Sequence, residues 1–331
     1  MILDASQKLD GCEHKDQVKG RAGNSRWLRF GLTLFGLGIL FAVAHFVVVP
    51  LWLPTAIVYA PNFGKKMDPR DDTNSAQLSS LGLTRQLRIA VGPPPASLSV
   101  WIMEPTTAER PQGTVFVFHG IRDKKSSMLG TGRMLANAGY RVVLPDLRGH
   151  GQSSGDWLTY GVVESQDMVE ILNALAFQGL LTHPVAAFGC SYGGAIALQL
   201  AARDARVKKI VTVATFTSLH EAVRGSARQF VPGWAITESM IEKAVLKAGQ
   251  LANFTPSEAS PLTAITRTKA KVLLIHGKQD KKLPPSFSQA LHEAAPDHSE
   301  LILVEGADHD SIMRETTAGL KDRILSWLAC K

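Results

Sequence analysis

Cysteine is scarce in this chain of 331 residues, which contains only Cys12, Cys190 and Cys330. Two of them stand near the ends of the chain and one lies near its middle, so no structural disulfide is predicted. The fold must therefore rest on its hydrophobic core. Apolar residues make up 45% of the chain, which is enough for one large α/β core. Charged residues make up 20%, which is ordinary for a globular domain.

Signatures of bound ligands are also missing. The chain has no Gly-Lys-Ser/Thr phosphate loop, and Gly130-Thr-Gly132 lacks the third glycine of a dinucleotide fingerprint. Its histidines show no zinc-type spacing, so we expect neither a cofactor nor a metal. The net charge is +7, but the basic residues are spread along the chain without a recognisable binding motif. We therefore expect no nucleic-acid partner, and attraction to anionic membranes stays open.

The most informative motif is a Gly-x-Ser-x-Gly pentapeptide, Gly189–Gly193, centred on Ser191. It lies between a short apolar run, 184–189, and a run of small residues typical of a packed helix, 195–202. This context predicts a nucleophile elbow, in which the serine stands on a tight strand-to-helix turn and the glycines allow close packing. The motif therefore predicts a serine nucleophile.

Two further side chains follow strand-like apolar runs downstream. Asp280 comes after one such run and His309 after the next. A serine hydroxyl is a weak nucleophile, so it needs an imidazole to take its proton and a carboxylate to orient the ring. We predict that Ser191, His309 and Asp280 form a triad, with Asp308 or Asp310 as alternative acids.

Backbone amides that could stabilise an oxyanion are predicted at two positions. The apolar run 114–118 leads into a His-Gly turn, after which Ile121 would supply the first amide. Tyr192, directly after the serine, would supply the second from the start of a helix. Strand-like runs alternate with helical ones from residue 114 onward, which predicts a parallel sheet with helices on both faces.

These motifs resemble those of the α/β-hydrolase superfamily over about residues 85–331. The matching segments are His119-Gly120, Asp146–Ser153, Gly189–Gly193, His276–Asp280 and Gly306–His309. Within the superfamily the chain looks most like membrane-anchored ABHD-type and lysophospholipase-like (serine aminopeptidase S33) members, which are mostly esterases, thioesterases or lipases. The resemblance implies an α/β-hydrolase fold with a helical cap. It also implies Ser191 as nucleophile, His309 as general base and acid, Asp280 as orienting acid, and Ile121 and Tyr192 as amide donors.

An uncharged apolar run extends from Phe30 to Leu53. It is long enough to cross a bilayer, which takes ~20 residues. A cleaved signal peptide is the alternative, but its apolar region usually has only about 7–15 residues, and no good cleavage site follows here. We therefore expect an uncleaved anchor. More basic residues precede the run than follow it, which predicts a cytoplasmic N-terminus and an extracytoplasmic catalytic domain.

The expected organisation has four parts: a cytoplasmic tail (1–29), a transmembrane helix (30–53), a linker (54–85) and a catalytic domain (86–331). A cap insertion is expected at about 215–260, where residues 237–251 show apolar side chains at helical spacing. This stripe could pack on the core or admit an acyl chain.

The sequence thus predicts a membrane-anchored serine hydrolase that cleaves carboxylic esters of lipid-like or acylated substrates through an acyl-enzyme. Two alternatives stay open: a peptidase or amidase that uses the same triad, and a catalytically silent hydrolase fold that serves as a binding module. The intact triad argues against the second alternative. Matched ester and amide substrates would separate the first from an esterase.

Overall fold

The computed structural model describes residues 22–43, 49–65, 75–106, 109–230, 236–313 and 319–330. The chain divides into two units, Met1–Val49 and Pro50–Lys331. The first unit contains helix α1 (Ala22–Val43), whose large apolar side chains from Trp27 to Val43 are all exposed. Within the described ranges, no helix combines the length and the apolar character that crossing a bilayer requires.

The predicted transmembrane helix over 30–53 does not correspond to one helix of the described residues. Helix α1 ends at Val43, residues 44–48 lie outside the described residues, and helix α2 spans Val49–Val58. The end of the apolar run belongs to the second unit, because Leu53 packs against its core. Hydropathy alone does not distinguish residues covered by lipid from residues covered by protein, which is why the predicted boundary was wrong.

The expected linker over 54–85 needs a similar correction. Ile57, Val58 and Ala60 are buried in the main core cluster, so the segment after Leu53 is part of the folded unit. Residues 66–74 lie outside the described residues, and a short helix, α3 (Ser75–Ser80), precedes the sheet. Within the expected linker, Pro54 lies inside α2.

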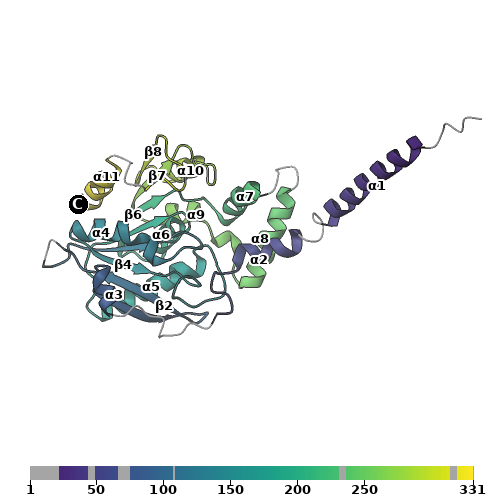
Figure 1. Ribbon diagram of the computed structural model, residues 1–331. Helices are drawn as coiled ribbons and strands as arrows, with labels where there is room; N and C mark the ends of the chain where they lie inside the picture. The colour runs from purple at the N-terminus through teal and green to yellow at the C-terminus, as the bar shows by residue number, and fades with distance from the viewer. Residues whose placement is uncertain are drawn as a thin grey trace, which may run out of the picture. The chain divides into compact units, whose positions relative to one another are not determined.

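An eight-stranded sheet in the order β1-β2-β4-β3-β5-β6-β7-β8 forms the centre of the second unit (Figure 1). Its strands are β1 (Arg85–Val91), β2 (Ala96–Met103), β3 (Thr114–Phe118), β4 (Arg141–Pro145), β5 (Val185–Cys190), β6 (Val207–Val213), β7 (Lys271–Gly277) and β8 (Ser299–Val304). Strand β2 is antiparallel to both of its neighbours, whereas β3 to β8 are parallel. The predicted mostly parallel sheet is thereby confirmed.

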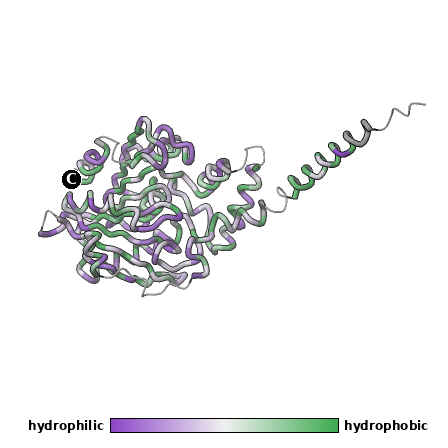
Figure 2. The backbone as a smooth tube through the Cα atoms, in the orientation of Figure 1, coloured by the Kyte–Doolittle hydropathy of each residue, from purple (hydrophilic) through white to green (hydrophobic). Residues whose placement is uncertain are grey.

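Helices cover both faces of this sheet. The helices that follow β3 are α4 (Leu129–Asn137), α5 (Val162–Phe177), α6 (Tyr192–Arg203), α7 (Leu219–Phe230), α8 (Glu238–Ala252), α9 (Pro261–Arg267), α10 (Ser286–Ala294) and α11 (Leu320–Ala329), with 3-10 turns at Lys125–Met128 and Pro256–Glu258. Strand β3 is buried at all its positions, as expected for a parallel strand covered on both faces. Its alternate side chains enter two separate core clusters. Figure 2 shows hydrophobic stretches running along the sheet and the helices packed on it.

Helices α7 and α8 lie between β6 and α9, in the segment expected to form a cap. On α8, Ile241, Ala244, Val245 and Ala248 are buried in the main core cluster. No described residue of α8 lines the cavity at the elbow, whereas α7 contributes to its wall. The apolar stripe of residues 237–251 therefore packs on the core, which is one of the two alternatives that the sequence left open.

Candidate active site

Ser191 stands between the end of β5 and the start of α6, on the predicted strand–turn–helix. Its backbone has φ 51° and ψ −112°, a conformation that non-glycine residues rarely adopt. The strand and helix approach so closely that a Cβ on Gly189 would lie 2.2 Å from the carbonyl oxygen of Gly193. A Cβ on Gly193 would lie 2.5 Å from the carbonyl oxygen of Phe118. Both glycines are therefore required by the packing around the turn.

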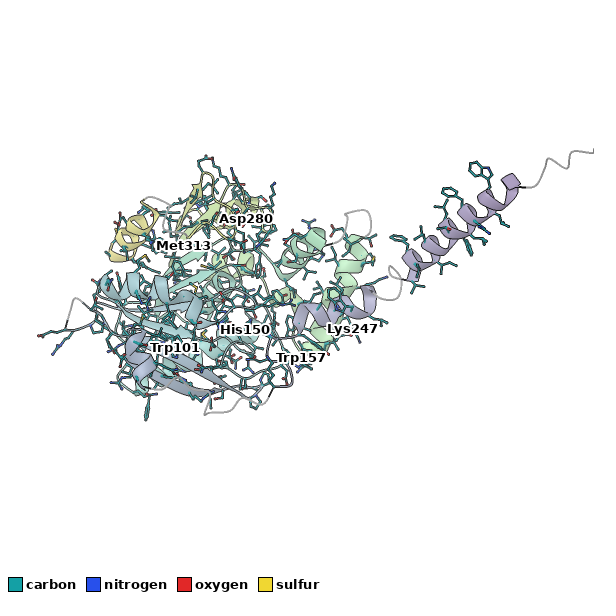
Figure 3. The ribbon with its side chains drawn as sticks, viewed as in Figure 1. Trp101, His150, Trp157, Lys247, Asp280 and Met313 are labelled. Carbon is teal, nitrogen blue, oxygen red and sulfur yellow. The ribbon has the colours of Figure 1, made fainter. Side chains whose placement is uncertain are left out.

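The predicted acid and base come together at the ends of β7 and β8. Nδ1 of His309 lies 2.7 Å from Oδ2 of Asp280. The other carboxylate oxygen of Asp280 accepts hydrogen bonds from the amides of Lys282 and Leu283, both at 2.9 Å. Asp280 is 4% exposed, and it lies on the loop that follows β7 (Figure 3). The carboxylate is thus fixed in place behind the imidazole.

The carboxylates of the two alternative acids, Asp308 and Asp310, bond to other residues. Asp308 accepts hydrogen bonds from the amide of Ser311 at 2.9 Å and from the amide of Asp310 at 3.1 Å. Asp310 forms an exposed ion pair with Lys282 at 2.6 Å. Of the three candidates, Asp280 is the one whose carboxylate lies within hydrogen-bond distance of the ring of His309.

His276 provides a second contact to the carboxylate that the sequence did not predict. Its ring is fully buried, and Nε2 lies 3.3 Å from Oδ2 of Asp280 and 2.8 Å from the carbonyl oxygen of Leu283. Nδ1 lies 2.6 Å from the hydroxyl of Ser288. The four-residue spacing to Asp280 was visible in the sequence, but it did not show that the side chain takes part.

The electrostatics of Asp280 follow from these contacts. Burial by itself would raise the pKa of the carboxyl group. Hydrogen bonds from His276, His309 and the amide of Leu283 outweigh burial and hold the pKa of Asp280 well below its ordinary range. The group is therefore ionised at neutral pH and can orient and stabilise the imidazole.

Two histidines outside the predicted triad hold the loop that carries Ile121. His119 accepts the amide of Leu147 at Nε2, 3.0 Å away, and its Nδ1 lies 2.8 Å from the carbonyl oxygen of Gly120. His150 accepts the amide of Arg122 at Nε2, 3.1 Å away. Both rings are fully buried and pack edge to face with centroids 5.0 Å apart.

Burial, together with the neighbouring His150, lowers the pKa of His119 to about 4. Burial also lowers the pKa of His150. Both rings are therefore neutral at pH 7. In each neutral ring one nitrogen can accept a hydrogen bond from a backbone amide while the other donates to a carbonyl oxygen. The sequence reading missed the role of His150 because its partner, Arg122, lies far away along the chain.

Tyr192 is anchored by its side chain as well as by its place in helix α6. Its hydroxyl donates to Oε1 of the fully buried Glu164 at 2.8 Å. Glu164 also accepts hydrogen bonds from the amides of Thr159 and Gly161, both at 2.8 Å. The residue that follows the serine is therefore held from two directions.

A cavity of about 480 Å³ opens at the elbow. Ser191, His309, Ile121 and Tyr192 all line it, so the structure brings together every predicted site residue except Asp280, which lies behind His309. Apolar side chains form much of the remaining wall: Met128, Val213, Ala214, Phe216, Ala222, Ile312 and Met313. Lys282 and Asp310 add charge to the lining. Among the residues that the structure describes, no cluster of His, Cys, Asp or Glu could hold a metal ion.

Known proteins resemble this chain in sequence and in fold. Residues 113–237 match the family model of the α/β hydrolase fold. The uncharacterised protein YqkD of Bacillus subtilis is 26% identical over 200 residues, which make up 59% of this chain and 64% of that protein. The match thus spans slightly less than two thirds of the length of that relative.

Solved structures extend the likeness to most of the chain. An esterase of Pyrococcus furiosus superposes with a TM-score of 0.62 at 20% identity, covering 80% of this chain and 98% of the esterase. An acylaminoacyl peptidase of Pyrococcus horikoshii gives a TM-score of 0.58 at 20% identity, covering 78% of this chain and 43% of the peptidase. At these identities the likeness shows a shared fold.

Proposed function

We propose that this chain, which has the α/β-hydrolase fold, is a serine hydrolase that cleaves carboxylic esters. The observation that carries the proposal is the shared cavity at the elbow. Ser191, on its strained turn, and His309, hydrogen-bonded to the buried Asp280, both line it. We expect this combination to activate the nucleophile, because the imidazole would take the serine proton while the carboxylate fixes the ring.

The mechanism follows from the roles of these groups. Ser191 attacks the ester carbonyl while His309 takes its proton at Nε2, since Nδ1 is engaged by Asp280. The amides of Ile121 and Tyr192 stabilise the tetrahedral oxyanion. His309 then returns the proton to the leaving alcohol, and an acyl-enzyme remains. Water repeats the sequence and releases the acid and Ser191.

The lining of the cavity supports an acyl group as the part of the substrate that it receives. Phe216, Ile312 and Met313 offer an apolar wall beside the serine. Burial of an acyl chain there would be favourable by about 0.8 kcal/mol for each CH₂ group. We therefore propose lipid-like or acylated esters as the substrate class.

Membrane anchoring through the N-terminal segment is part of the proposal. The apolar run 30–53 and the exposed apolar side chains of α1 support it. On α2, Leu51 is 72% exposed and Trp52 is 63% exposed, and tryptophan is enriched at membrane interfaces. The bias of basic residues favours a cytoplasmic N-terminus and an extracytoplasmic hydrolase unit. Extraction of membranes with alkaline carbonate and protease protection of sealed vesicles would test attachment and orientation.

Labelling of the full-length protein with a fluorophosphonate probe tests the serine hydrolase assignment. Wild type should label and Ser191→Ala should not, because the probe reacts only with an activated serine. Ser226→Ala is the matched control, since Ser226 also lines the cavity and should leave labelling intact. Folded wild type that does not react would favour the binding-module alternative.

Substrate class is tested separately, with p-nitrophenyl esters of increasing chain length and with matched anilides. Faster turnover of the esters, with a chain-length optimum, supports the esterase proposal. Faster turnover of the anilides would instead support the peptidase or amidase alternative.

A further inference from the structure

The last carbonyl groups of helix α2 are bonded by residues of the hydrolase core. The carbonyl oxygen of Ala56 accepts Nη2 of Arg122 at 3.1 Å, and that of Ile57 accepts the hydroxyl of Tyr160 at 3.0 Å. The carbonyl oxygen of Val58 accepts the amide of Leu158 at 2.8 Å. Terminal carbonyls of a helix have no partner within the helix and usually turn to water or a local cap. Here they connect α2 to segments that are distant in the sequence.

The first of these connections reaches the loop that carries Ile121. Arg122 follows Ile121 directly and has a left-handed backbone with φ 59°. Its amide donates to His150, and its guanidinium donates to Ala56 at the negative end of the α2 dipole. The peptide adjoining the proposed oxyanion donor is thus held on one side by a buried ring and on the other by α2.

The second connection reaches the other proposed donor. Tyr160 also has a left-handed backbone, with φ 55°, and it lines the cavity. Its ring packs edge to face on that of Tyr192, with centroids 5.5 Å apart. The side-chain amide of Gln199 donates to the carbonyl oxygen of Tyr160 at 2.8 Å. The hydroxyl bond to Ile57 completes the support of a ring that contacts Tyr192.

Helix α2 is itself firmly attached. Val58 is fully buried and Ile57 is 5% exposed, both within the main core cluster. Just beyond the helix, the side-chain amide of Asn62 donates to the carbonyl oxygens of Gly151 and Ser153, both at 2.9 Å. The end of α2 therefore offers a fixed reference for the two residues that bond to it.

We propose that α2 positions the oxyanion-binding amides, with Arg122 and Tyr160 as its positioning residues. The carbonyls of Ala56 and Ile57 hold these two side chains, which in turn hold the backbone of Ile121 and the ring of Tyr192. The inference rests on the proposed serine hydrolase function. Under this inference, Ala56 and Ile57, which lie just after the N-terminal apolar run, support the geometry of the active site.

The principal variants are Tyr160→Phe, which keeps the ring and loses the hydroxyl, and Arg122→Met, which keeps a long side chain and loses the guanidinium. We expect kcat for the best ester to fall about tenfold in Tyr160→Phe and less in the exposed Arg122→Met, with KM nearly unchanged. The expected losses are smaller than the roughly 100-fold or more that follows complete removal of an oxyanion donor. Affinity for a boronic acid that mimics the tetrahedral intermediate should fall in parallel with kcat/KM.

Thr268→Val is the control for a merely structural effect. It also removes a buried hydroxyl-to-carbonyl bond, from Thr268 to Ala201 at 3.1 Å, but Thr268 does not line the cavity. It should lower thermal stability while kcat and boronate affinity stay at the wild-type level. Equal kcat losses in Thr268→Val and Tyr160→Phe would overturn the inference.

A double-mutant cycle tests the involvement of α2 itself. Val58→Ala loosens the helix end within the full-length protein and should lower kcat. If α2 acts through Tyr160, the double variant Val58→Ala/Tyr160→Phe should lose less than the product of the two single effects. If the two effects were independent, or if the single variants kept the wild-type kcat, the inference about α2 would be overturned. Turnover by wild type would still support the proposed hydrolase function in that case. Wild type without turnover would instead count against the proposed function.

Discussion

The carboxylate of Asp280 lies 2.7 Å from Nδ1 of His309, although 29 positions separate the two residues in the chain. The pairing arises because β7 and β8 are parallel neighbours, so the loops at their carboxyl ends lie side by side. The carboxylate is buried and ionised, which favours the imidazole tautomer with a proton on Nδ1 and leaves Nε2 for the proposed role of base.

Replacement of Asp280 by asparagine should therefore disable turnover without unfolding the protein. We expect Asp280→Asn to lower kcat for ester hydrolysis by on the order of 10³–10⁴, because the amide no longer stabilises the imidazolium or enforces the tautomer. Asp310→Asn is the matched control, since it breaks only an exposed ion pair with Lys282. Steady-state kinetics on the two variants provides the measurement. A larger loss in Asp310→Asn would reassign the acid.

Acid should weaken the fold through the two buried histidines. The folded protein holds the pKa of His119 at about 4, mainly by burial, whereas the ordinary value is 6.5. Between these values the unfolded chain binds more protons, so stability falls as pH drops from 6.5 to about 4. His119 alone accounts for a loss on the order of 3 kcal/mol, at about 1.4 kcal/mol per pKa unit.

Thermal unfolding across this pH range measures the effect. The His119→Gln variant, which can still donate and accept, should show a flatter dependence than wild type. Some slope should remain, because burial also lowers the pKa of His150. His220→Gln, at a side chain that is 37% exposed, should follow the wild-type curve. Identical slopes in wild type and His119→Gln would contradict the prediction.

The buried ion pair between Lys125 and Asp146 should make a large difference to stability when broken. The two side chains are 2% and 1% exposed, and Asp146 also accepts the amides of Lys125 and Gln152. Asp146→Asn leaves a buried ammonium without its counter-charge and should cost about 3–5 kcal/mol of unfolding free energy.

An exposed ion pair offers the comparison. Glu305→Gln removes the partner of Lys278 where the two side chains are 78% and 45% exposed, and it should cost less than about 1 kcal/mol. Urea denaturation of both variants gives the two free energies. If Asp146→Asn and Glu305→Gln lowered the unfolding free energy by similar amounts, burial of Lys125 would not explain the effect of its ion pair with Asp146.

The close approach of strand and helix at the elbow predicts a strong effect of one methyl group. Gly189→Ala would place a Cβ 2.2 Å from the carbonyl oxygen of Gly193, so the turn that carries Ser191 must shift. We expect kcat/KM to fall more than about 100-fold, as small displacements of a nucleophile do. Gly130→Ala, in helix α4 with open space around it, should keep full activity and gain up to about 1 kcal/mol of stability. Esterase assays and thermal unfolding of both variants check the pair.

The sequence by itself determined the features that depend on neighbouring residues. The Gly-x-Ser-x-Gly motif between an apolar run and a helical run was sufficient to locate the elbow at Ser191. The strand-like runs before Asp280 and His309 placed both side chains at one edge of a parallel sheet, because the carboxyl ends of parallel strands share that edge. These inferences needed only local propensity and the regular geometry of the fold.

The tertiary structure decided the features that depend on distant partners. His276 and His150 contribute through their rings, Glu164 anchors Tyr192, and α2 accepts hydrogen bonds from Arg122 and Tyr160 that span 66 and 103 positions. The apolar run 30–53 likewise gave no sign that Leu53 packs on the core of the second unit. Hydropathy and motif spacing describe what a residue can do, whereas the partner that satisfies a buried polar group or covers an apolar one is chosen only when the chain has folded.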